Sequence, residues 1–174
     1  EVEEVQAAYG ARPVRWLLDN SQMDERWCLV HATHMDSDET REMAERGAVA
    51  GLCPITEANL GDGIFNGVEY MQAGGRFGVG SDSNVRIALA EELRLYEYSQ
   101  RLQHRQRTLL AEESSSNGRY LYQAAAHGGA QALGRDSGSI AVGQWADLLA
   151  LDTSHKALIL REEDDLLDSW IFAG

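Results

Sequence analysis

The sequence predicts an α/β fold in which short, buried strands alternate with helices along the chain. Three apolar runs have the length and composition of strands covered on both faces, and helical patterns separate them. These runs are residues 26–31, 48–53 and 76–80. Such alternation is typical of βαβ units with parallel strands. The strand ends, near His31, Cys53 and Asp82, lie 22 and 29 positions apart. A (β/α)8 barrel, at about 30 residues per unit, and a doubly wound sheet fit this spacing equally well.

Helix signals flank these strands. Apolar residues recur at helical spacing in residues 2–9. After the first strand, Asp36 is followed three positions later by Glu39, which is the pattern of a capping box, and Gly47 marks the end of that helix. After the second strand, which Pro54 ends, residues 57–67 read as a glycine-rich loop.

The second half of the sequence is mainly helical. A short helix through residues 68–71 is closed by two glycines, and longer helices are predicted over residues 88–110 and 120–133. A turn at residues 138–143 then leads into an apolar run at residues 147–152, which predicts a separate strand.

Composition and charge restrict the class of protein. The chain has 174 residues, 44% apolar and 25% charged, as expected for a soluble globular protein. The net charge of −13 argues against nucleic acid or an anionic membrane surface as the main partner. Cys28 and Cys53 each lie inside an apolar run, so we expect two buried thiols in a reducing compartment, the cytoplasm. No apolar stretch reaches about 18 residues, the length of a membrane span.

Polar residues gather directly after the three predicted strands. In a barrel, catalytic groups lie where strands pass into the following loops, so these residues are the candidates for chemistry. They are His31, Thr33 and His34 after the first strand, Thr56, Glu57 and Asn59 after the second, and Ser81, Asp82, Ser83 and Asn84 after the third.

Several of these residues, and His127, also have a plain structural interpretation. Asp82 follows a glycine-rich stretch that lets a metal approach closely, but it would serve equally as the N-cap of the next helix. His31 is either a functional group or a hydrogen-bonded core histidine. Glu57 and Asn59 are either turn formers or substrate contacts. His127 precedes two glycines and is expected to help end or bend a helix.

Three motifs, in order, carry a resemblance to a known family. They are Val-His-Ala-Thr-His at 30–34, Gly-Val-Gly-Ser-Asp at 78–82 and Gly-Gln-Trp-Ala-Asp-Leu-Leu at 143–149. With them the chain resembles the second half of an amidohydrolase-superfamily enzyme. A further stretch, residues 56–65, is similar to the formiminoglutamate deiminase branch, which serves histidine degradation.

The resemblance implies a fold and a domain division. Residues 1–135 would be the last strands and helices of a metal-dependent (β/α)8 barrel. Residues 136–174 would be part of a small flanking β-sandwich that both ends of the polypeptide build, with residues 146–149 as its first returning strand. Because the sequence opens inside a helix and without Met, we expect further residues before Glu1.

The resemblance also assigns roles. Asp82 matches an aspartate that binds the single divalent metal, zinc, and handles a proton of its bound water. His31 matches a histidine beside that water and the substrate. From their place in the loop after the second strand, rather than from the resemblance, we expect Glu57 and Asn59 to contact substrate. A catalytic zinc site needs about three protein ligands. The other ligands and the catalytic glutamate would precede Glu1, so the chain alone is expected to be inactive.

The implied reaction is hydrolysis of the C=N bond of N-formimino-L-glutamate to N-formyl-L-glutamate and ammonia. The expected partner is this small molecule, and the full-length enzyme is expected to be a homo-oligomer. One alternative is a deaminase of the same superfamily that acts on a purine or pterin ring. The other is a half-barrel that serves as an interaction module without catalysis.

Overall fold

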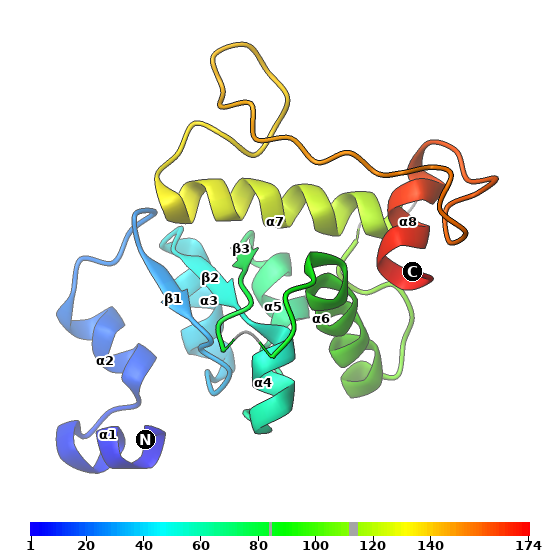
Figure 1. Cartoon of the computed structure of the whole chain (residues 1–174). Helices are drawn as coiled ribbons and strands as arrows, with labels where there is room; N and C mark the ends of the chain where they lie inside the picture. Colours follow the sequence, from blue (N-terminus) through cyan, green and yellow to red (C-terminus); the bar gives the residue numbers. More distant parts are fainter. Residues whose placement is uncertain (84, 112–114) are drawn as a thin grey trace.

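The structure is a mixed α/β arrangement around a small parallel sheet. A computed structural model describes residues 1–83, 85–111 and 115–174. The sheet contains β1 (Cys28–Val30), β2 (Val49–Leu52) and β3 (Arg76–Val79), in the order β1-β2-β3 with parallel pairing (Figure 1). The first three predicted strands and their parallel direction are therefore confirmed, and β2 is the central strand of the three.

Helices connect the strands and cover the sheet. Those among the described residues are α1 (Val2–Tyr9), α2 (Pro13–Asn20), α3 (Ser37–Glu45), α4 (Pro54–Leu60), α5 (Gly67–Gln72), α6 (Leu89–His104), α7 (Asn117–Leu133) and α8 (Asp164–Phe172). The sequence did not predict α2 or α4. Each starts with proline at its first position, where the missing N–H costs nothing. The loop expected from residue 57 is therefore wrong up to Leu60, and Gly61 at φ 73° ends α4.

The predicted capping box starts α3 and also ties α2 to it. The Asp36 carboxylate accepts from the Glu39 backbone N–H at 2.9 Å, and the Glu39 carboxylate accepts from the Asp36 N–H at 2.8 Å. Glu39 is buried and also accepts from Arg12 Nε at 3.0 Å and from the Arg15 N–H at 3.1 Å. One side chain thus caps a helix and docks its neighbour.

The core lies between the sheet and the helices that pack on it. Its largest buried side chains come from the strands and from the helices that pack on them, and they include Met43, Leu52, Tyr70, Phe77 and Leu93. The Tyr70 hydroxyl lies 2.5 Å from the Ala48 carbonyl and 3.1 Å from the Arg76 carbonyl. It therefore links the starts of β2 and β3 inside an otherwise apolar layer.

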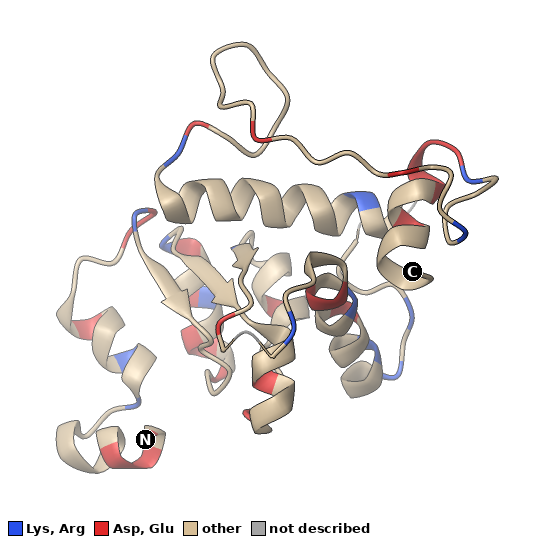
Figure 2. Cartoon of the chain, viewed as in Figure 1, with Lys and Arg blue, Asp and Glu red and all other residues tan. Residues whose placement is uncertain are grey.

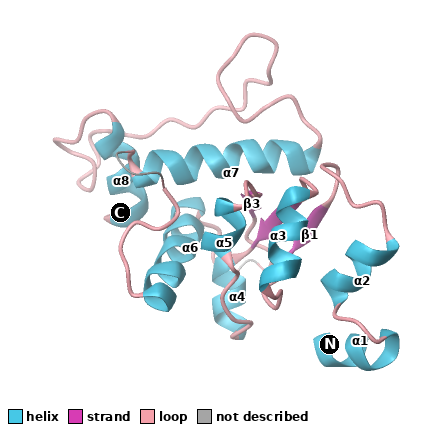
Figure 3. Ribbon diagram, turned by 180° about the vertical axis from the view of Figure 1, so that it is seen from behind, coloured by secondary structure: helices cyan, strands magenta, loops and turns pink. Residues whose placement is uncertain are grey.

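Helix α7 packs directly on β3, between the sheet and the long loop that follows (Figures 1 and 3). A Cβ added at Gly128 would lie 2.0 Å from the Phe77 carbonyl oxygen, so only glycine allows this approach. The expectation that His127 ends this helix is wrong. The helix continues to Leu133, and the glycines after His127 serve close packing.

No strand forms where the sequence predicts one at residues 147–152. Within the part of the chain that the structure describes, this segment has no strand beside it, so its backbone cannot form a ladder. Ile140, Val142 and Leu148 are exposed along the same loop. Residues 164–172 instead form α8, which packs on α6 and α7. The division into a barrel part and a sandwich part remains a prediction.

The two thiols differ in exposure. Cys53 is buried as expected, whereas Cys28 is exposed, and both are free. Cys28 lies on the edge strand β1, whose Cys28 and Val30 face away from the core, and none of the described residues buries either of them.

The acidic residues behind the net charge are spread over most helices rather than gathered on one face (Figure 2). Within the described residues, no helix has the length and apolar character to span a membrane.

Candidate active site

The carboxyl ends of the parallel strands bring His31 and Asp82 together. His31 follows β1 and Asp82 follows β3, with β2 and Cys53 between them. His31 Nε2 lies 4.0 Å from Asp82 Oδ2, and both side chains are partly open to solvent. An imidazole and a carboxylate from strands that are not adjacent therefore face each other at one edge of the sheet.

The backbone at these two residues is strained. His31 has φ 66°, the adjacent Ala32 φ 49°, and Asp82 φ 41°, all in the left-handed region that residues with a Cβ seldom adopt. Such residues cost about 1–3 kcal/mol each and cluster at functional sites. The alternative role of Asp82 as a helix N-cap is wrong, because α6 begins at Leu89 with Ala88 as its N-cap.

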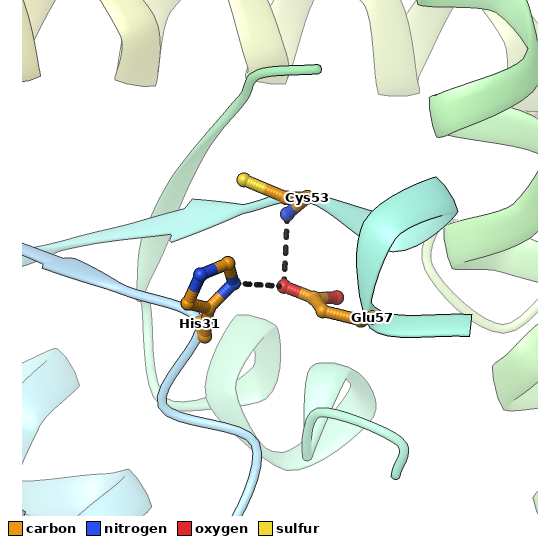
Figure 4. A group of neighbouring side chains, drawn as sticks. All are labelled: His31, Cys53 and Glu57. Atoms are coloured by element: carbon orange, nitrogen blue, oxygen red, sulfur yellow. Dashed lines mark hydrogen bonds and ion pairs between the residues drawn. The ribbon is translucent and has the colours of Figure 1, made fainter. Parts of the chain in front are cut away.

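Glu57 completes the group from the first turns of α4. Its carboxylate is buried, with 5% of the residue exposed. Oε1 accepts a hydrogen bond from the Cys53 backbone N–H at 2.8 Å and lies 3.2 Å from His31 Nδ1 (Figure 4). Burial raises the pKa of Glu57, and the Cys53 N–H and His31 oppose that rise by favouring the carboxylate.

Two sets of side chains here could hold a cation. One consists of His31, Cys53 and Glu57, and the other of Asp82 with His31. The ligand atoms of His31, Cys53 and Glu57 lie within 4.8 Å of one another. Burial, followed by the nearby Glu57, raises the pKa of the Cys53 thiol to about 11, so this thiol is protonated at neutral pH and would have to lose its proton to bind a metal. Among the described residues, the basic group nearest to Asp82 is the His31 imidazole, and no Lys or Arg pairs with the Asp82 carboxylate. The open carboxylate of Asp82 beside an imidazole therefore fits a divalent metal better.

The other predicted residues lie apart from this group or support it. Asn59 and His34 are exposed. Asn59 is two positions beyond the buried Glu57 on α4, so it points away from the sheet edge. The buried Thr56 hydroxyl lies 2.9 Å from Ser83 Oγ and ties α4 to the loop after β3. Asn84 lies outside the described residues.

Sequence reasoning missed Glu92, a buried carboxyl group behind the site. Glu92 Oε2 accepts from the Ile55 backbone N–H at 2.8 Å, at the start of α4. Its other oxygen is buried and has no hydrogen-bond partner among the described residues, and burial raises the pKa of Glu92 to about 7. The available signal was that position 92 shares a helix face with Leu89 and Tyr96.

Comparison with known proteins places this geometry in a family. The amidohydrolase family model matches residues 1–172. The chain belongs to the amidohydrolase family. It is 54% identical over 175 residues to a formimidoylglutamate deiminase from Pseudomonas aeruginosa. That alignment covers all of this chain and 39% of the relative, so the chain spans well under half the length of this amidohydrolase.

Solved amidohydrolase structures have the same fold. An amidohydrolase from Brucella melitensis matches with a TM-score of 0.93 and 53% identity, over 99% of this chain and 38% of its own. An adenosine deaminase from Xanthomonas campestris, solved with bound zinc, matches with a TM-score of 0.86 and 28% identity, over 99% of this chain and 38% of its own. The recognition of the family from three short motifs is thus confirmed.

Proposed function

We propose that the protein containing this chain hydrolyses N-formimino-L-glutamate to N-formyl-L-glutamate and ammonia. The 54% identity to a formimidoylglutamate deiminase across the whole chain carries this proposal. The 4.0 Å approach of His31 to Asp82 at the carboxyl edge of a parallel sheet supports it, because barrels of this kind place their chemistry there.

Asp82 would hold one divalent metal, for which zinc is the best choice, since a related deaminase was solved with zinc. A bound metal supplies a water molecule whose pKa is lowered toward about 7. Asp82 would accept a proton from the attacking water. His31, with Nε2 directed at Asp82, would hold or pass a proton as the carbon–nitrogen bond breaks and ammonia leaves.

The rest of the proposed site lies outside this chain. A catalytic zinc takes about three protein ligands, and Asp82 would supply one of them. We therefore propose that residues 1–135 close a barrel with upstream strands, and that the chain by itself neither turns over substrate nor holds zinc tightly.

Two substitutions in the full-length protein test these roles. Asp82→Asn should remove most activity and lower the zinc content, whereas His31→Asn should remove activity with zinc largely retained. Asp38→Asn and His155→Asn, at exposed positions, are matched controls. Zinc measured by mass spectrometry beside ammonia release separates the roles, and equal zinc loss in both site variants would contradict the assignment.

A second candidate function is deamination of a purine or related ring. The 28% identity to an adenosine deaminase favours it. Ammonia release should be compared for N-formimino-L-glutamate and adenosine at equal concentrations. Turnover of adenosine alone would replace the main proposal, and turnover of neither substrate would favour the interaction module without catalysis.

A further inference from the structure

We propose that Glu57 is a positioning residue that orients His31, rather than a contact of the substrate. In this arrangement His31 donates its Nδ1–H to Glu57 Oε1, which leaves Nε2 facing Asp82. The inference rests on the proposed function of His31 and goes beyond it by assigning the residue that sets its ring and tautomer.

The first support is that Glu57 is itself held in place. Its Oε1 accepts from the Cys53 N–H at 2.8 Å, four residues back, where β2 passes into α4. The Glu57 N–H donates in turn to the Cys53 carbonyl at 2.9 Å. The side chain and the backbone of Glu57 thus both bind Cys53. The position of the carboxylate is therefore defined independently of its contact with His31.

The second support is the direction of the hydrogen bond to His31. Oε1 already acts as an acceptor, and a carboxylate oxygen has a second lone pair for another donor. His31 Nδ1 lies 3.2 Å from this oxygen, so a proton on Nδ1 completes a hydrogen bond, whereas an unprotonated Nδ1 would face another acceptor. A neutral imidazole with its proton on Nδ1 has an unprotonated Nε2, which is the nitrogen 4.0 Å from Asp82.

The third support is that the backbone of His31 itself restrains the position of its ring. His31 has φ 66°, and its N–H donates to the Gly51 carbonyl at 2.8 Å. The backbone sets where the side chain leaves the strand, and the contact with Glu57 sets how the ring is turned. Figure 4 shows the imidazole and the carboxylate directed toward each other across the end of β2.

The burial of Glu57 argues against a direct substrate contact. Only 5% of the residue is exposed, and Oε1 is committed to the Cys53 N–H and to His31. Outer partners of this kind typically change activity by about 10–100-fold when they are removed. A substrate contact would act on KM, whereas an orienting partner acts on kcat.

The test compares Glu57→Leu with Glu57→Gln in the full-length protein. Leu removes the acceptor, so kcat should fall by about 10–100-fold with KM within about twofold and zinc retained. Gln keeps an acceptor oxygen at the same place and should restore most of kcat. Glu45→Leu, at an exposed position on α3, is the control. A rise in KM with kcat unchanged would make Glu57 a substrate contact and overturn the proposal.

A readout without substrate separates this inference from the proposed function. Nitrogen NMR of histidine-labelled protein, with the signals assigned through His31→Asn, reports which ring nitrogen carries the proton. The wild type should show the proton on Nδ1 of His31, and Glu57→Leu should shift it toward Nε2. A wild-type His31 with its proton on Nε2 would overturn the proposal, even if Glu57→Leu does not fold. Absence of formiminoglutamate turnover with the Nδ1 tautomer intact would instead count against the proposed function alone.

Discussion

Gly128→Ala tests how closely α7 is seated on the sheet. A Cβ at position 128 would lie 2.0 Å from the Phe77 oxygen and 2.5 Å from the Phe77 carbonyl carbon. Non-bonded carbon needs roughly 3.5 Å, so α7 and β3 would have to separate by about 1.5 Å. Overpacking costs about 1–3 kcal/mol, and we expect the upper end because the obstacle is backbone that cannot rotate away. The helix propensity of Ala returns about 1 kcal/mol, which leaves a net loss of about 2 kcal/mol.

The neighbouring glycine provides the matched control. A Cβ at Gly129 would meet no heavy atom of the described residues within 4 Å. Gly129→Ala should therefore stabilise the protein by up to about 1 kcal/mol through helix propensity alone. Urea unfolding of the full-length variants, followed by tryptophan fluorescence, measures both changes. A Gly128→Ala protein as stable as Gly129→Ala would refute the packing of α7 on Phe77.

Two further predictions concern buried carboxyl groups. Burial raises the pKa of Glu92 from 4.5 to about 7, so the folded state binds this proton more tightly than the unfolded state does. The stability that this group contributes is therefore fully present below pH 4.5 and is lost as the pH rises through about 7. The loss of stability is on the order of 3 kcal/mol. In urea unfolding measured from pH 5 to pH 8, Glu92→Gln should reduce the fall of the unfolding free energy with pH. A variant whose unfolding free energy falls with pH as steeply as that of the wild type would contradict the assignment. Glu39→Ala removes the capping box and the partner of Arg12, and should destabilise the protein by about 2 kcal/mol or more, whereas the exposed Glu45→Ala should have little effect. Equal unfolding midpoints for the two alanine variants would show that Glu39 does not join α2 to α3.

Local patterns in the sequence were sufficient for the three strands, for several of the helices and for part of the site. The capping box of Asp36 and Glu39 uses hydrogen bonds between residues three positions apart, so sequence alone predicts it. The three apolar runs predict buried parallel strands, and the rule that strand ends carry chemistry places His31 and Asp82 among a wider set of candidates. The family resemblance then singled out these two residues. Periodicity did not separate a barrel from a doubly wound sheet, and the choice came from the family resemblance.

Only the tertiary structure decided the contacts between residues distant in sequence. Glu57 reads as a loop residue in sequence, yet it lies on α4 and faces His31, 26 positions earlier. Glu92 contacts Ile55 across 37 positions, and no local pattern encodes that contact. The apolar run at residues 147–152 has the composition of a strand but forms none, because a strand requires a partner and the described residues provide none beside it. Propensity and periodicity describe residues within one turn or one strand. The burial of a side chain and the pairing of a strand depend instead on the elements that pack against it.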